Sequence, residues 1–132
     1  RDAWWKQVSG FVLLGLCAAS LVLSLRKRWP RFQLGRFDQW RLLHSLLGVG
    51  TIVAAGVHSG FRLGENLNFV LMSSFLGVVL LGSGSGLITA LEHRLPGRAG
   101  ATLRRGMTGF HVLFFWPIPL LVLFHVLAVY FY

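Results

Sequence analysis

Acidic residues and cysteine are scarce in this chain of 132 residues, which has four Asp and Glu residues together and a single cysteine. One cysteine, Cys17, excludes a disulfide framework within the chain. The sequence also lacks a Cys-x-x-Cys-His segment for covalent haem attachment and the paired cysteines typical of a zinc site. Any cofactor is therefore expected to be held non-covalently by other residues.

Charge of either sign is also scarce, because only 13% of the residues are charged while 55% are hydrophobic. Soluble domains carry about 25% charged residues, so this composition excludes an ordinary soluble globular domain. The net charge is nevertheless +9. A nucleic-acid-binding protein needs a solvated basic face. This chain has few solvated residues that could form such a face, so we expect no nucleic-acid partner.

Four windows of the sequence contain no charged residue: residues 7–25, 42–61, 66–91 and 106–132. About 20 apolar residues in a helix cross the hydrocarbon layer of a membrane. Lipid offers no hydrogen-bond partner to the backbone, so each window should be helical. The sequence predicts an all-α integral membrane protein, an up-and-down four-helix bundle that forms a single transmembrane domain over residues 1–132.

The basic residues predict how these spans are oriented. Ten of the 13 lie in two connections: Arg26, Lys27, Arg28, Arg31, Arg36, Arg41, Arg94, Arg98, Arg104 and Arg105. By the positive-inside rule these connections face the cytoplasm and both termini are extracytoplasmic. Aromatic residues then fall at the interfaces: Trp4, Trp5, Tyr130 and Tyr132 outside, and Trp29 and Trp40 inside. We expect a multi-pass protein of the cell inner (cytoplasmic) membrane, surrounded by lipid, whose second and fourth spans run parallel.

Four of the five histidines lie inside the expected spans, His44 and His58 in the second and His111 and His125 in the fourth. The two histidines of a span are 14 positions apart, which is about four helical turns, so both should face the same way. Parallel spans place His44 near the depth of His111, toward the cytoplasm, and His58 near the depth of His125. Ionisable residues inside a membrane are costly and indicate function.

The spacing excludes one shared metal ion, because zinc ligands lie at about 2 Å from the metal and the histidines of one span are about 21 Å apart. A haem iron accepts one imidazole on each face of a planar apolar ring. We therefore predict two haem groups, an inner one between His44 and His111 and an outer one between His58 and His125. Iron with both axial positions occupied by protein favours electron transfer over oxygen binding.

This pattern of four histidines on the second and fourth helices resembles the bis-haem four-helix bundle of membrane cytochromes b. That group includes cytochrome b of bc-type complexes, ferric-reductase-like cytochromes and the cytochrome b subunits of respiratory dehydrogenases. The resemblance covers nearly the whole chain in architecture, but only the four histidines carry it specifically. It implies that both groups are haem b. It also implies transmembrane electron transfer between a quinone pool and partner redox subunits, without singling out a branch.

The chain departs from two branches. It has no nicotinamide- or flavin-binding domain after the fourth span, and none of the further helices of a full-length bc-type cytochrome b. We therefore expect an electron-transfer subunit of a larger oxidoreductase complex rather than a self-contained enzyme. An extracytoplasmic cytochrome c or iron–sulfur protein is the expected partner.

Arginines near the histidines are candidates for binding haem propionates. Arg41 lies three residues before His44 and Arg62 four residues after His58, so each is expected on the helical face of its neighbour. Arg104 and Arg105 are expected on the inner side near His111. Topology signals and snorkelling explain such arginines equally well.

Small, aromatic and polar residues of the spans carry weaker signals. Gly48 and the stretch 82–86 suit helix contacts or an approaching flat ring, with helix contacts favoured. Pro117 and Pro119 should bend the fourth span. Aromatics that could pack on porphyrin edges, or simply on other helices, are Phe110, Phe114, Phe115, Trp116 and Phe124. Candidates for a quinone site, or plain interfacial residues, are Asp38, Gln39, Trp40, Glu65, Asn66 and Asn68. His93 is expected to be solvated.

Two other functions suit the same residues. The histidines could brace the helices of a non-haem membrane anchor or bind a quinone there. They could also form a relay in a metal-ion or proton transporter. A reduced-minus-oxidised spectrum separates both from a cytochrome b.

Overall fold

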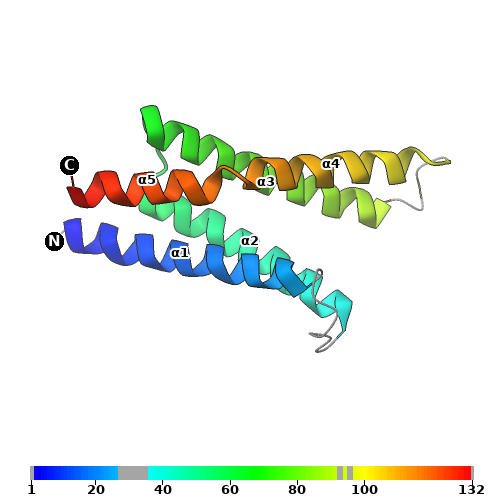
Figure 1. Ribbon diagram of the computed structural model, residues 1–132. Helices are drawn as coiled ribbons and strands as arrows, with labels where there is room; N and C mark the ends of the chain where they lie inside the picture. The colour runs from blue at the N-terminus through cyan, green and yellow to red at the C-terminus, as the bar shows by residue number, and fades with distance from the viewer. Residues whose placement is uncertain (1, 27–35, 92–93, 95–96, 132) are drawn as a thin grey trace. The chain divides into compact units, whose positions relative to one another are not determined.

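The computed structural model describes residues 2–26, 36–91, 94 and 97–131. Within these residues the chain forms five helices and no strand (Figure 1): α1 (Asp2–Arg26), α2 (Phe37–Ser59), α3 (Asn66–Leu91), α4 (Ala99–Phe115) and α5 (Ile118–Phe131). The predicted all-α fold is confirmed. The structural positions expected for Lys27, Arg28, Trp29, Arg31, His93 and Tyr132 lie outside the described residues.

Four segments of the described chain are long and apolar enough to cross a membrane: Ala3–Val22, Gln39–Ser59, Asn66–Leu91 and Ala99–Phe131. Large apolar side chains on them are exposed, among them Val22 at 63%, Leu80 at 71% and Leu113 at 60%. Apolar surface of this kind is stable in lipid and costly in water. The chain is therefore a multi-pass membrane protein in contact with lipid.

The chain divides into two compact units, unit 1 (Arg1–Arg62) and unit 2 (Leu63–Tyr132). Each unit contains two of the candidate spans. Two neighbouring spans of opposite direction in each unit are consistent with the predicted up-and-down four-helix class.

Unit 1 is an antiparallel pair of helices, α1 and α2, which lie side by side in Figure 1. The second helix stops at Ser59 because Gly60 adopts the left-handed conformation, with φ of 63°. The Phe61 N–H then donates to the Gly56 carbonyl at 2.8 Å, as in the common glycine-terminated helix end. This glycine sets the C-terminal end of α2.

Unit 2 packs α3 against α4 and α5, again in antiparallel fashion. Contacts run along the whole length, from the hydrogen bond between Ser85 and Thr108, at 2.8 Å, to the one between Asn68 and His125, at 2.7 Å. Side chains of α4 pack on three glycines of α3: Phe114 on Gly77, His111 on Gly82 and Met107 on Gly84. The expected use of small residues as helix contacts is confirmed at Gly82 and Gly84, whereas a Cβ at Gly48 or Gly86 meets nothing within 4 Å among the described residues.

The fourth span consists of two helices, because α4 ends at Phe115 and α5 begins at Ile118. Pro117 and Pro119 have no N–H to continue the helical hydrogen bonds, and their rings disfavour the preceding turn. The Leu121 N–H donates to the Pro117 carbonyl at 3.0 Å, which starts the next helix. The helix is thus interrupted at the position where Pro117 and Pro119 were expected to act.

Candidate functional site

His58 of α2 is held by the start of α1 in unit 1. Its Nδ1 lies 3.0 Å from the hydroxyl oxygen of Ser9. Ser9 donates its hydroxyl proton to the Lys6 carbonyl, also at 3.0 Å. A serine has a single hydroxyl proton, so its oxygen accepts from His58, and Nδ1 of His58 carries the proton.

A glycine lets the His58 ring approach the backbone of α1. A Cβ at Gly10 would lie 3.1 Å from Cε1 and 3.6 Å from Nδ1 of His58. Residues larger than glycine at this position would press on the imidazole. The contact therefore fixes the ring beside Ser9.

His111 of α4 is bound to the backbone of α3 in unit 2. Its Nδ1 lies 2.7 Å from the carbonyl oxygen of Val78. A carbonyl oxygen only accepts hydrogen bonds, so Nδ1 of His111 is the donor. A Cβ at Gly82 would lie 2.9 Å from Cε1 and 3.0 Å from Nδ1 of this ring.

His125 of α5 is bound to the side chain of Asn68, near the start of α3. Its Nδ1 lies 2.7 Å from the amide oxygen Oδ1 of Asn68. This oxygen also only accepts, so Nδ1 of His125 carries the proton. His111 and His125 thus both face α3, and the prediction that the two histidines of the fourth span face the same way is confirmed.

These three imidazoles share one feature, a proton on Nδ1 that is donated to a neighbouring helix. In the neutral form of such an imidazole the lone pair lies on Nε2. A neutral imidazole with this pattern is a metal ligand through Nε2, and a hydrogen bond from the other nitrogen sets the tautomer. His44, 14 residues before His58 in the unbroken helix α2, is partly buried. The chain therefore places histidines suited to metal binding in both units.

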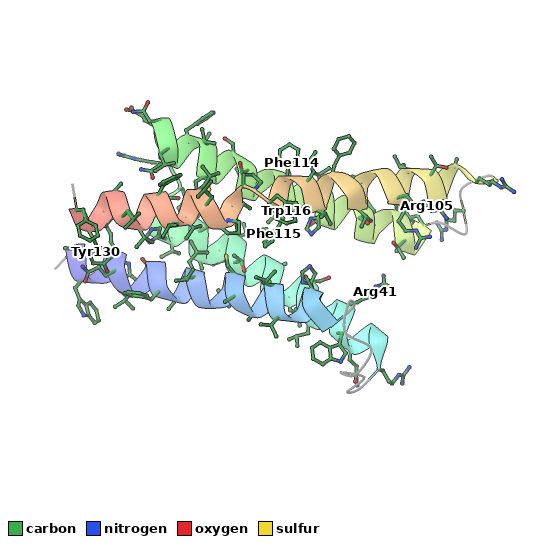
Figure 2. The ribbon with its side chains drawn as sticks, in the orientation of Figure 1. Arg41, Arg105, Phe114, Phe115, Trp116 and Tyr130 are labelled. Atoms are coloured by element: carbon green, nitrogen blue, oxygen red, sulfur yellow. The ribbon has the colours of Figure 1, made fainter. Side chains whose placement is uncertain are left out.

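The predicted helical positions of Arg41 and Arg62 have different outcomes. Arg41 lies within α2 and is exposed, three residues before His44 as expected for a shared helical face (Figure 2). Arg62 does not share the helical face of His58, because α2 ends at Ser59 and Gly60 turns the chain away. The helix-face argument for Arg62 was wrong for this reason.

Arg104 and Arg105 lie inside α4, which begins at Ala99 rather than near residue 106. The helix extends past the charge-free window because a helix need not end where its apolar stretch ends. Figure 2 shows Arg105 toward the start of α4 and Tyr130 toward the end of α5. These two residues therefore lie at opposite ends of the fourth span.

The aromatic residues of the fourth span gather at its interruption, where Figure 2 shows Phe114, Phe115 and Trp116. The Phe114 ring packs on Gly77 of α3. A Cβ added at Gly77 would lie 2.8 Å from Cδ1 of Phe114. Trp116 is 71% exposed. Plain helix packing therefore accounts for Phe114.

The two candidate quinone groups are not alike. The Gln39 side chain accepts a hydrogen bond from the Arg36 N–H at 3.4 Å, at the start of α2. Asn68 is committed to His125, a role that the sequence analysis missed. Ser9 and Val78 were missed as well. Their signal lies in the antiparallel order of neighbouring spans, which brings the start of one helix to the end of the next.

Comparison of this chain with protein-family models, curated proteins and solved structures finds no match.

Proposed function

We propose that this chain is a membrane cytochrome b subunit that binds two haem b groups and carries electrons across the cell inner membrane. The observation that supports the proposal is the common state of His58, His111 and His125, each of which donates through Nδ1 to a neighbouring helix. This state places the lone pair on Nε2, where an axial ligand of haem iron needs it.

The donor set fits haem better than it fits a compact metal site. The histidines of each unit are 14 residues apart, which corresponds to about 21 Å along a straight helix, so one unit offers imidazoles at two depths. We propose the pairs His44/His111 for the inner haem and His58/His125 for the outer haem. Bound haem would supply one-electron chemistry between ferric and ferrous iron.

The residues of the chain would bind, orient and shield the cofactors. His44, His58, His111 and His125 would hold the haem iron, and the apolar helices would keep water away from it. Arg41 supplies a cation near His44 for a propionate, and Arg62 supplies one near the outer end of α2. A quinone pool and partner redox subunits, an extracytoplasmic cytochrome c or iron–sulfur protein among them, would provide and accept the electrons. The chain would act within a larger oxidoreductase complex, with both termini extracytoplasmic.

The coordination is tested on the purified, reduced protein with carbon monoxide. Two axial imidazoles leave no open position on the iron, so we expect a b-type spectrum that carbon monoxide leaves unchanged. His111→Leu should open one position and make about half of the haem signal sensitive to carbon monoxide, or remove it. His93→Leu, which changes a histidine between the spans, is the control and should match the wild type. Rapid carbon monoxide binding by the wild type would contradict bis-histidine ligation.

A structural anchor without haem is the second candidate, because the same three hydrogen bonds join neighbouring helices within each unit. Interhelical hydrogen bonds in membranes contribute about 0.6 kcal/mol on average. An anchor would purify without colour, and His111→Leu would only lower its stability. The spectrum distinguishes the two functions without further assumptions.

A further inference from the structure

One carbonyl of α3 is open to a side chain from another helix. In a helix the side chain at position i lies against the carbonyl of position i−4. Four hydroxyl groups of the described residues show that geometry: Ser24 to Ser20 at 3.0 Å, Ser45 to Arg41 at 3.0 Å, Thr51 to Leu47 at 2.6 Å and Thr89 to Ser85 at 2.8 Å. The residue in that position relative to Val78 is Gly82, which has no side chain. The Val78 carbonyl therefore stays accessible.

His111 occupies this opening. Its Nδ1 is 2.7 Å from the Val78 oxygen. A Cβ at Gly82 would lie 2.9 Å from its Cε1 and 3.0 Å from its Nδ1. Contacts this short force a shift, so alanine at position 82 would push the imidazole off the carbonyl. Gly82 is thus a requirement of the hydrogen bond and not only a small residue between helices.

Asn68 is held in place for His125 by the loop before α3. Gly64 has φ of 75°, in the left-handed region that favours glycine. A Cβ at Gly64 would lie only 2.7 Å from Cβ of Asn68. The loop therefore packs against the base of the Asn68 side chain, whose amide oxygen receives Nδ1–H of His125 at 2.7 Å.

We propose that α3 sets the midpoint potentials of the two haems through the histidines of the fourth span. It acts on His111 through Gly82 and the Val78 carbonyl, and on His125 through the Asn68 amide. This inference rests on the haem-binding function proposed above. Neither Gly82 nor Asn68 is a ligand, and both are positioning residues. A hydrogen bond from Nδ1–H raises the basicity of Nε2. A more basic axial ligand stabilises ferric over ferrous iron and lowers the midpoint potential.

The first arm of the test compares Gly82→Ala with Gly86→Ala in a redox titration followed through the haem absorption. Both substitutions add one methyl group to α3, but nothing lies within 4 Å of a Cβ at Gly86 among the described residues. We expect Gly82→Ala to raise one midpoint potential, by about 59 mV for a tenfold change in the ratio of reduced to oxidised haem. Gly86→Ala should leave both potentials unchanged. Equal titrations of the two variants would overturn the inference.

The second arm compares Asn68→Leu with Asn68→Asp. Leucine removes the acceptor and should raise the other midpoint potential, whereas a carboxylate is a stronger acceptor and should lower it. A merely structural role of Asn68 would shift the potential in the same direction in both variants, and that result would overturn the proposal.

Imidazole ¹⁵N chemical shifts serve where a variant loses its haem. In Gly82→Ala, His111 should no longer favour the tautomer with its proton on Nδ1. In Gly86→Ala this tautomer should persist. Persistence in both variants would contradict the inference. A wild-type protein without haem would overturn the proposed function and this inference together. If the protein binds two haems and neither midpoint potential changes in Gly82→Ala, Asn68→Leu or Asn68→Asp, this inference alone is overturned.

Discussion

The two units carry the same pair of histidines, 14 residues apart, on helices of different construction. In unit 1 the helix between His44 and His58 is unbroken. In unit 2 the chain between His111 and His125 is interrupted at residues 116–117. Both histidines of unit 2 nevertheless bond to α3. The direction of an imidazole is therefore governed by its neighbouring helix as much as by the periodicity of its own.

The acceptors also differ between the units. In unit 1 the acceptor for His58 is the hydroxyl of Ser9, which itself donates to a carbonyl. In unit 2 the acceptors are a backbone carbonyl and a side-chain amide. The backbone acceptor can be removed only indirectly, through Gly82. The following experiments exploit these differences.

The largest expected effect comes from replacing ligands across the two units. His58→Leu and His125→Leu should each remove the outer haem, so that about one haem per chain remains. The double variant His58→Leu/His125→Leu should lose no more haem than either single variant, because the proposal assigns both residues to the outer haem. Haem quantification after purification measures this. A double variant that loses both haems would refute the pairing of His58 with His125.

Exchanging the helix construction of the units should have the next largest effect. Gly50 lies six residues after His44, as Pro117 lies six after His111. Gly50→Pro would break α2 and should lower the free energy of unfolding in detergent by about 3 kcal/mol. The converse change, Pro117→Ala/Pro119→Ala, restores two backbone donors and should be tolerated. Equal destabilisation by both changes would contradict the contrast between the units.

A smaller effect is expected at the glycine beside His58. In Gly10→Ala the new Cβ would lie 3.1 Å from Cε1 of His58, so the ring must give by a few tenths of an ångström. This movement disturbs its hydrogen bond with Ser9. We expect about a tenfold loss of affinity for one haem, typical of a disturbed outer-shell partner. Gly15→Ala in the same helix is the control, since nothing lies within 4 Å of its Cβ among the described residues. Haem titration of the apoprotein compares the two variants. A comparable loss of affinity in both would contradict a specific role of the contact between Gly10 and His58.

The smallest effect is expected at the hydrogen bond between Ser85 and Thr108, which joins α3 to α4 at 2.8 Å. Ser85→Ala should cost about 0.6 kcal/mol of stability, the average for such bonds in membranes, without changing either haem potential. Ser83→Ala is the control, since Ser83 lies about 200° around the helix from Ser85. Thermal unfolding in detergent measures both. A changed potential in Ser85→Ala would show that tuning is not confined to the acceptors of the histidines.

Charge-free length and helical periodicity were sufficient to predict much of the fold. The third span, Asn66–Leu91, has the bounds expected from the sequence. The interruption of the helix at Pro117 and Pro119 followed from the missing N–H groups. The start of α4 at Ala99 was missed because Arg104 and Arg105 interrupt the apolar run without interrupting the helix.

The candidate site was predictable at the histidines but not at their acceptors. His111 meets Val78 and His125 meets Asn68 because α3 packs antiparallel to α4 and α5 in one register, and a register depends on packing that a single sequence does not reveal. The argument for Arg62 failed at one residue, since Gly60 ends α2 before the arginine. Local backbone chemistry there outweighed helical spacing.

The central claim is that four histidines in two units bind two b-type haems. Its most direct test is the reduced-minus-oxidised spectrum of the purified protein together with the ratio of haem to protein. The account predicts a b-type α-band and about two haems per chain. A colourless protein, or a single haem that survives the loss of any one of the four histidines, would contradict it.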